Sequence, residues 1–179
     1  IYMMPYTADS VMWQLSFPLS ETEAKALSSK GSKELKNEAT RRTQWHNPIP
    51  QVLKATLEAD ISGYPVYDRE LLKPEAMRSL EEVSLIEDAA HAMSTCRGQG
   101  ANQALFDALA CARAISRGCQ HSLRWREVGI RKSVLTEFEA EMIHRTTPKV
   151  KDSAAAAKFL HSKQILKVQN KPRGRLFKI

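Results

Sequence analysis

The sequence has few of the residues that mark the simplest protein classes. Its 179 residues include three cysteines and seven glycines, and aromatic residues make up 7%. Long stretches without charge, such as residues 1–8 and 10–20, contain Ser, Thr, Gln or Pro and fall short of the roughly 20 apolar residues that cross a bilayer. These features exclude a transmembrane helix, and with 42% hydrophobic residues they indicate one medium-sized globular unit with or without a tail.

The cysteines and histidines form no recognisable ligand set. Cys96, Cys111 and Cys119 make no Cys-x-x-Cys pair and are odd in number, which argues against a disulfide framework and a zinc knuckle. The histidines lack metal-ligand spacing, so no metal site is predicted. No signal peptide is recognised, and a reducing, cytoplasmic location is expected. Since the sequence begins with Ile, we expect it to be a piece of a longer protein.

The positive charge is confined to the end of the chain. The whole chain has 27 Lys or Arg and 20 Asp or Glu, a net charge of +7. Residues 149–179 hold nine of the basic residues and one acidic residue, which gives +8 and leaves −1 for residues 1–148. The body is therefore electrically balanced, and the overall charge says little about what the body binds.

The first 80 residues predict a hairpin and short helices. Apolar residues alternate over 11–17, which is typical of a strand, and this strand is expected to pair with residues 1–6. Ser20 and Glu23 have capping-box spacing and predict a helix that Gly31 ends. Two further helices are expected, over residues 32–46 and about 51–59.

A strand, a loop and a long helix are expected after residue 80. Residues 83–86 are β-branched and apolar and predict a buried strand, and residues 88–100 are predicted to form a loop. A helix is expected over 101–117, ended by Gly118. Its apolar stripe, suited to packing on a sheet or a ligand, consists of Ala104, Leu105, Ala108, Leu109 and Ala112.

Two more helices are expected near the end of the chain, over 122–144 and 153–161. The inward residues of the first are predicted to be Val128, Ile130, Val134, Leu135, Phe138 and Met142.

A carboxylate and two glycines precede the long helix, an arrangement that can hold a polar ligand. Asp88 could accept hydrogen bonds from sugar-like hydroxyls, and Gly98 and Gly100 let the backbone approach a flat or anionic ligand. The helix start adds unpaired N–H groups and about half a positive charge. On spacing alone, a tight connection without any ligand fits equally well.

This segment resembles the second FAD-binding motif of the class A FAD-dependent aromatic monooxygenases, which include p-hydroxybenzoate and salicylate hydroxylases. The resemblance rests on residues 86–91 (Ile-Glu-Asp-Ala-Ala-His), residues 97–104 (Arg-Gly-Gln-Gly-Ala-Asn-Gln-Ala), the Asp107-Ala108 pair and the upstream Asp68-Arg69 pair. It implies an FAD-dependent, NAD(P)H-using hydroxylase of an aromatic or related small molecule, with O2 as co-substrate.

The resemblance also implies roles for individual residues. Asp88 would bind the ribityl or ribose hydroxyls of FAD, and Arg97 would add a positive charge nearby. A helix start stabilises the negative charge that reduction places on the pyrimidine edge of the isoalloxazine. The residues that would line this edge with backbone groups are Gly98, Gln99, Gly100, Ala101 and Asn102. Supporting roles would fall to Asp68, Arg69, His91 and Asp107.

Two positions depart from the family. Glu87 stands where the family normally has Gly, and Thr95 where it often has Pro. A Glu side chain about 5 Å from the FAD phosphates, at an effective dielectric of about 20, would cost roughly 3 kcal/mol, near a hundredfold in affinity. A Glu87 side chain that points into solvent or pairs with Arg69 or Arg97 would cost little.

The first FAD motif of the family is missing. Gly98 and Gly100 alone have Gly-x-Gly spacing, and Gln103 occupies the position that would complete the dinucleotide fingerprint. The chain therefore resembles the C-terminal portion of such an enzyme, and the N-terminal dinucleotide-binding half is an expected partner.

The expected fold class is an α+β or α/β fragment. It would contain part of a substrate-domain β-sheet, the strand-loop-helix of the second FAD-binding motif, and C-terminal helices. The expected divisions are a partial substrate-binding domain with a helical insertion at 1–80, the FAD motif and its helix at 81–118, and C-terminal helices with a basic tail at 119–179.

Several residues have competing interpretations. Met12, Trp13 and Phe17 could line an aromatic-substrate pocket, although aromatic residues on an alternating strand more often pack in a core. His91 and Cys96 are interpreted as structural rather than reactive residues.

Two alternatives from other functional classes stay open. One is a degenerate, non-enzymatic module that has lost flavin binding. The other is a basic tail that binds nucleic acid or an anionic surface. Since Phe177 is the tail's one aromatic residue beyond position 162, no base-stacking platform is visible, which favours a solvated terminus. The basic residues concerned are Lys163, Lys167, Lys171, Arg173, Arg175 and Lys178.

Overall fold

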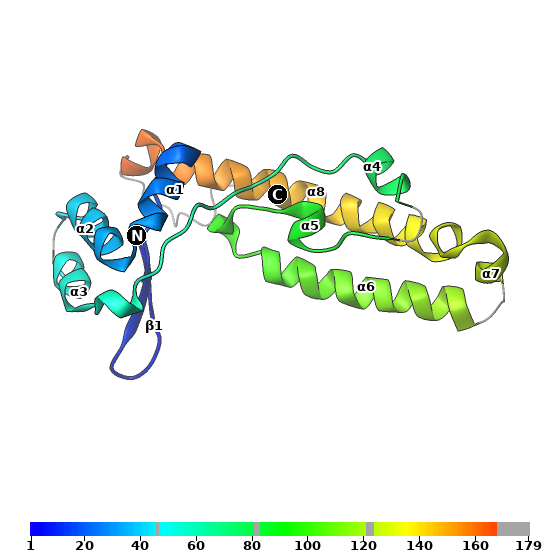
Figure 1. The fold of residues 1–179 in the computed structure, drawn as a ribbon, viewed down its shortest axis with the longest axis horizontal. Coiled ribbons are helices and arrows are strands. Elements are labelled where there is room, and N and C mark those ends of the chain that lie inside the picture. Colours follow the sequence, from blue (N-terminus) through cyan, green and yellow to red (C-terminus); the bar gives the residue numbers. More distant parts are fainter. Residues whose placement is uncertain (46, 81–82, 121–123, 168–179) are drawn as a thin grey trace. The chain divides into compact units, whose positions relative to one another are not determined.

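The computed structural model describes residues 1–45, 47–80, 83–120 and 124–167 (Figure 1). The chain forms two compact units, Ile1–Val66 and Tyr67–Ile179, hereafter unit 1 and unit 2. The architecture is α+β and mostly helical, and its sheet is a two-stranded antiparallel one. His46, Ser122 and the tail beyond residue 167 lie outside the described residues, so the predictions for these positions stay untested.

Unit 1 begins with the predicted hairpin. Strands β1 (Tyr2–Pro5) and β2 (Val11–Gln14) pair antiparallel, with Met3 opposite Trp13. The strand ends at Gln14 rather than continuing to residue 17. The Trp13 indole Nε1 donates a hydrogen bond to Thr56 Oγ1 at 3.0 Å, which fixes the hairpin to the end of the third helix.

Three helices complete unit 1. They are α1 (Glu21–Ser29), α2 (Ser32–Arg42) and α3 (Ile49–Ala55), followed by the 3-10 turn η1 (Glu58–Asp60). The capping box at Ser20 is confirmed, and Gly31 adopts a φ of 83° between the first two helices. The third helix begins before the predicted residue 51, because Pro50 lies in its first turn, where the missing N–H has no helical partner.

The predicted strand at residues 83–86 is wrong. These residues have no strand structure, and Val83 and Ile86 are 57% and 37% exposed. A strand is held by hydrogen bonds to a neighbour, and among the described residues β1 and β2 pair only with each other. The Val83 carbonyl instead accepts a hydrogen bond from Arg131 Nη2 at 2.6 Å.

The predicted loop at 88–100 contains two short helices, α5 (Asp88–His91) and the 3-10 turn η2 (Thr95–Arg97). It leads into α6 (Gly100–Gln120), a 21-residue helix. The prediction that Gly118 ends this helix is wrong, since Gly118 lies inside it, against η3.

The predicted helix at 122–144 is divided at Gly129, which has a φ of 84°. It becomes α7 (Arg124–Val128), the π-helix η3 (Arg131–Leu135) and the start of α8 (Thr136–Leu160). The long α8 continues through Pro148 and takes in most of the separately predicted helix at 153–161. The 3-10 turn η4 (Lys163–Leu166) follows.

The core of unit 2 lies where α8 meets α4 (Pro74–Arg78), α5 and α6 (Figure 1). Its buried members are Met77, Ala90, Phe138 and Met142. Four of the predicted inward residues, Val134, Leu135, Phe138 and Met142, are buried as expected. Val128 is 38% exposed, and that prediction is wrong because Gly129 breaks the helical phase between it and α8.

Candidate functional site

A buried carboxylate holds the segment around α5 in place. Asp107, on α6, is fully buried, and its Oδ2 accepts hydrogen bonds from the Glu87 backbone N–H at 3.0 Å and from His91 Nε2 at 2.6 Å. Its Oδ1 accepts a hydrogen bond from Arg145 Nη2 of α8 at 2.7 Å. One side chain therefore connects the turn at residue 87, α5, α6 and α8.

The charge of Asp107 is stabilised by these contacts. Burial by itself raises the pKa of this carboxyl, but the hydrogen bonds from Arg145, the Glu87 N–H and His91 outweigh it, so the pKa lies below its ordinary value of 3.8. The Arg145 guanidinium also donates to Gln103 Oε1 at 2.7 Å and to Glu141 Oε1 at 2.9 Å. We call Gln103, Asp107, His91 and Arg145 the buried polar network, and the exposed Glu141 lies at its edge.

The loop before α6 presents backbone groups to open space. Gly98 has a left-handed φ of 60°, and a Cβ added at Gly98 or Gly100 would meet nothing within 4 Å. The first helical hydrogen bond runs from the Gln103 N–H to the Gln99 carbonyl at 3.0 Å, so the N–H groups of residues 100–102 precede it. The first turn of α6 contains no acidic residue. This helix start can hold a flat or anionic group.

The other residues predicted for this site differ in their exposure and in whether their side chains already have partners. Asp88 is exposed at the start of α5, and its carboxylate has no partner among the residues that the structure describes. Arg97 forms a two-point ion pair with Asp152 of α8, at 2.9 Å and 3.1 Å, so its charge is already compensated. Arg69 donates to the Ala89 carbonyl and braces α5, whereas Asp68 is exposed.

Glu87 has a backbone conformation that is typical of glycine. Its φ is 55° and its ψ is −141°, and it is the one non-glycine residue with positive φ in the described part of the chain. Its N–H is held by Asp107 and its carbonyl accepts from the His91 N–H at 2.8 Å, so the turn is fixed on both sides. A side chain in this region costs about 1–3 kcal/mol. Position 87 therefore has the backbone conformation of a glycine site although it carries a Glu side chain.

Replacing Glu87 with Gly is expected to stabilise unit 2 by about 1 kcal/mol, since the relief of strain exceeds the added flexibility of the unfolded chain. Urea denaturation would measure this, followed by the fluorescence of Trp125 in α7 after Trp13→Phe and Trp45→Phe remove the tryptophans of unit 1. The matched control is Glu70→Gly, at an exposed residue without positive φ, which should destabilise slightly. If Glu87→Gly and Glu70→Gly changed the free energy of unfolding equally, the assignment of backbone strain to Glu87 would be wrong.

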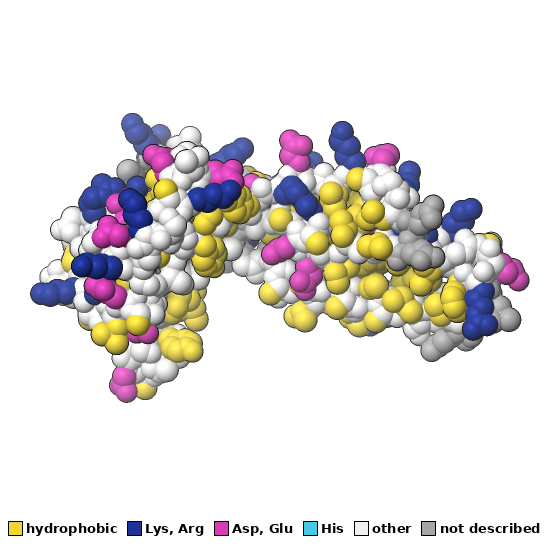
Figure 2. Space-filling view, in the orientation of Figure 1, with side chains coloured by type: hydrophobic (Ala, Val, Ile, Leu, Met, Phe, Trp, Pro, Cys, Tyr) yellow, Lys and Arg dark blue, Asp and Glu magenta, His cyan; other side chains and the backbone are white. Residues whose placement is uncertain are grey.

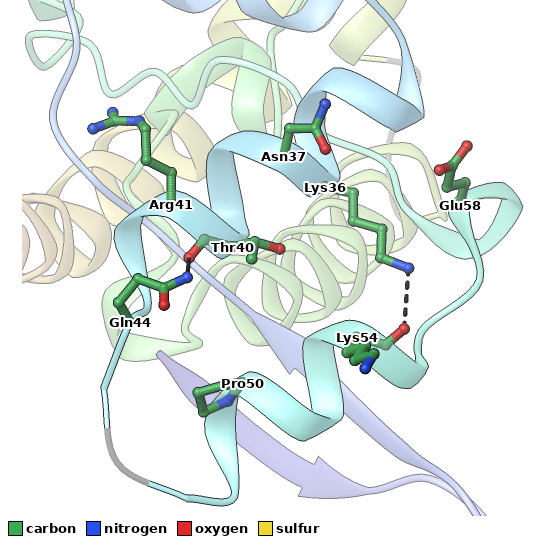
Figure 3. A pocket seen from close by; sticks show the side chains of 8 residues that line it. All are labelled: Lys36, Asn37, Thr40, Arg41, Gln44, Pro50, Lys54 and Glu58. Atoms are coloured by element: carbon green, nitrogen blue, oxygen red, sulfur yellow. Dashed lines mark hydrogen bonds between the residues drawn. The ribbon is translucent and has the colours of Figure 1, made fainter.

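The predicted substrate-pocket residues are in unit 1, whereas the residues of the predicted flavin motif belong to unit 2. Met12 and Trp13 are half-buried on β2. Unit 1 also has a surface groove between α2 and α3 (Figure 3), but it contains neither of them. The Lys36 ammonium there already donates to the Thr56 and Lys54 carbonyls, at 2.5 Å and 3.2 Å. We assign this groove no role.

Sequence reasoning missed Arg145, which completes the buried polar network. Its spacing from Glu141 is that of an ordinary surface pair on a helix, and nothing near it in the sequence points to Asp107, 38 residues away. In the described part of the chain, no three His, Cys, Asp or Glu residues lie close enough to bind a metal ion, and no helix is both long and apolar enough to cross a membrane.

Comparison with known proteins gives one partial similarity. A segment of 76 residues is 36% identical to Aurachin C monooxygenase/isomerase of Stigmatella aurantiaca. The match covers 42% of this chain and 19% of that protein, so the chain spans about a fifth of the length of the curated relative. No family model matches the chain, and it has no significant match among solved structures. The similarity relates the chain to a monooxygenase over part of its length.

Proposed function

We propose that this chain is the C-terminal part of an FAD-dependent, NAD(P)H-using monooxygenase that hydroxylates an aromatic or related small molecule. The observation that carries the proposal is the open glycine loop at 98–100 before a long helix without acidic residues in its first turn. The partial identity to a monooxygenase supports the same chemistry. The three unpaired cysteines agree with a cytoplasmic location.

The residues of the loop fit the flavin by their chemistry. Asp88, exposed and without a partner in the described part of the chain, would accept hydrogen bonds from ribityl or ribose hydroxyls. Backbone N–H groups of residues 99–102 would meet the pyrimidine edge of the ring and stabilise negative charge there, while the Gly98 N–H donates to the Thr95 carbonyl at 3.0 Å and shapes the loop. FAD, reduced by NAD(P)H, would supply the oxygen-activating chemistry. The adenine and pyrophosphate contacts would come from a dinucleotide-binding half outside this chain.

The test is the visible spectrum of the full-length protein. We expect stoichiometric FAD, and oxidation of NAD(P)H that an aromatic substrate stimulates; a colourless protein would refute the enzyme assignment. Gly98→Val should lower FAD affinity about tenfold or more, because it strains the loop and fills the open side. Gly31→Val is the matched control, since Gly31 also has positive φ and open space but lies in unit 1. The 179-residue chain alone is expected to bind FAD weakly or not at all.

The second candidate function is a non-enzymatic module that keeps the fold without flavin, and Glu87 favours it. Its exposed side chain adds a negative charge beside Asp88, where the family has Gly. Glu87→Gly in the full-length protein should raise FAD affinity if the rest of the site is intact. An unchanged affinity, together with no detectable flavin in the native protein, would favour the module.

A further inference from the structure

Two contacts attach the turn before the glycine loop to helix α8. The 3-10 turn η2 packs against α8 within unit 2 (Figure 1). At the start of η2, the Ser94 hydroxyl donates a hydrogen bond to the Ser153 carbonyl at 2.7 Å. At its end, Arg97 Nη2 donates to Asp152 Oδ1 at 3.1 Å, and Arg97 Nε lies 2.9 Å from Asp152 Oδ2. Two adjacent residues of α8 therefore hold both ends of η2.

The ion pair lies directly beside the loop that is predicted to receive flavin. Arg97 is followed in the chain by Gly98, whose N–H donates to the Thr95 carbonyl at 3.0 Å and closes η2. On the open side of the loop, a Cβ added at Gly98 or Gly100 would meet nothing within 4 Å. Because glycine restricts the backbone little, packing on that side does not fix the loop. The loop therefore takes its position from its attachment to α8.

Asp152 contributes to this attachment through its side chain and little to the core. Ser94 and Ser153 are 8% and 0% exposed, whereas the Asp152 side chain is 43% exposed. A carboxylate that meets a guanidinium at two points fixes the direction of the guanidinium as well as its distance. Removing this carboxylate is therefore expected to release Arg97 while the buried packing between η2 and α8 stays.

We infer that Asp152 is a positioning residue for the glycine loop. Its ion pair with Arg97 holds η2 on α8 and keeps residues 98–100 in the conformation that receives the flavin. A loop that is already held needs less ordering when a ligand binds, so loss of the pair lowers the affinity for that ligand. This inference rests on the proposed function, because the ligand it concerns is FAD.

Hydrogen exchange of the 179-residue chain, followed by NMR, tests the attachment. The amide that reports on it is that of Gly98, since its hydrogen bond closes η2. We expect Asp152→Asn to speed its exchange about fivefold, the effect of a partly exposed two-point ion pair. Asp152→Arg should speed it about tenfold or more, because two guanidinium groups then repel each other. The double variant Arg97→Asp/Asp152→Arg exchanges the two charges and should restore the protection.

A second carboxylate on α8 supplies the matched control. Figure 2 shows Asp and Glu side chains at several places on the exposed face of unit 2. Glu137 is exposed in the first turn of α8, about 22 Å along the helix from Asp152. Glu137→Gln removes the same charge from the same helix and should leave the exchange of the Gly98 amide unchanged. Equal exchange rates in Asp152→Asn, Asp152→Arg and the native chain would overturn the inference.

The dissociation constant of FAD tests the positioning role, since a purely structural role would leave it unchanged. Titration of the flavin-free full-length protein with FAD should give a dissociation constant about threefold higher for Asp152→Asn, and close to the native one for Asp152→Glu and Glu137→Gln. Faster exchange of Gly98 with unchanged FAD affinity would overturn the inference. A native full-length protein that binds no FAD would refute the proposed function, and the exchange of Gly98 would then still decide whether Asp152 holds η2.

Discussion

Replacing Asp107 with Ala is expected to destabilise unit 2 by about 3 kcal/mol. The change leaves the partly buried Arg145 guanidinium without its fully buried partner, and it removes the acceptor of the Glu87 N–H and of His91. Breaking a buried ion pair from one side typically costs about 3–5 kcal/mol. The lower end applies here, because Arg145 keeps its contacts with Gln103 and Glu141.

Glu141→Ala is the matched control for this change. Glu141 pairs with the same guanidinium, but its side chain is 51% exposed, so its loss should cost less than about 1 kcal/mol. Urea denaturation followed by Trp125 measures both variants. Similar losses for the two would show that burial of the Asp107 pair adds no stability.

The same carboxylate makes unit 2 sensitive to acid. Because the folded-state pKa of Asp107 lies below its ordinary value of 3.8, the stabilisation is present above that value and is lost as the pH falls through the folded pKa. Asp107→Asn should therefore be less stable at neutral pH but show a flatter dependence below about pH 4. If unit 2 of the Asp107→Asn variant still lost its stability steeply in acid, titratable groups other than Asp107 would be responsible for that transition.

Features of the fold that depend on neighbouring residues could be predicted from the sequence. The capping box at the start of α1 is one example, with the Glu23 N–H donating to Ser20 Oγ at 3.3 Å and the Ser20 N–H donating to Glu23 Oε2 at 3.0 Å. The hairpin is another, since a short turn joins its two strands. Residues 83–86 have the composition of a strand, but a strand needs a partner that composition does not supply.

The orientation of α6 could not be predicted from hydrophobicity. Its apolar stripe predicts a buried face, yet Leu105 is 71% exposed while Asp107 is fully buried. The reason is a contact distant in sequence, because Arg145 compensates the carboxylate and makes the polar face the packed one. The spacing of Gly98 and Gly100 predicts the loop and the helix start of the candidate site. The contacts that hold this site in place come from α8, and the glycine spacing does not predict them.

Replacing Gly118 with Leu is expected to destabilise unit 2 by about 3 kcal/mol. A Cβ at residue 118 would lie 2.4 Å from Val134 Cγ2 and 3.2 Å from the Ser133 carbonyl oxygen. Val134 is buried and β-branched, so it cannot turn away, and α6 would have to separate from η3. Inserting a side chain into a packed interface typically costs about 1–3 kcal/mol.

Gly100→Leu is the control in the same helix, where the new side chain meets open space and better helix propensity offsets any loss. The double variant Gly118→Leu/Val134→Ala should recover part of the lost stability, and urea denaturation of the four proteins in this cycle gives the coupling between the two residues. Equal stabilities of Gly118→Leu and Gly100→Leu would mean that α6 and η3 do not touch at Gly118. In that case no packing contact would explain why Gly118, which the sequence predicts at the end of a helix, lies inside α6.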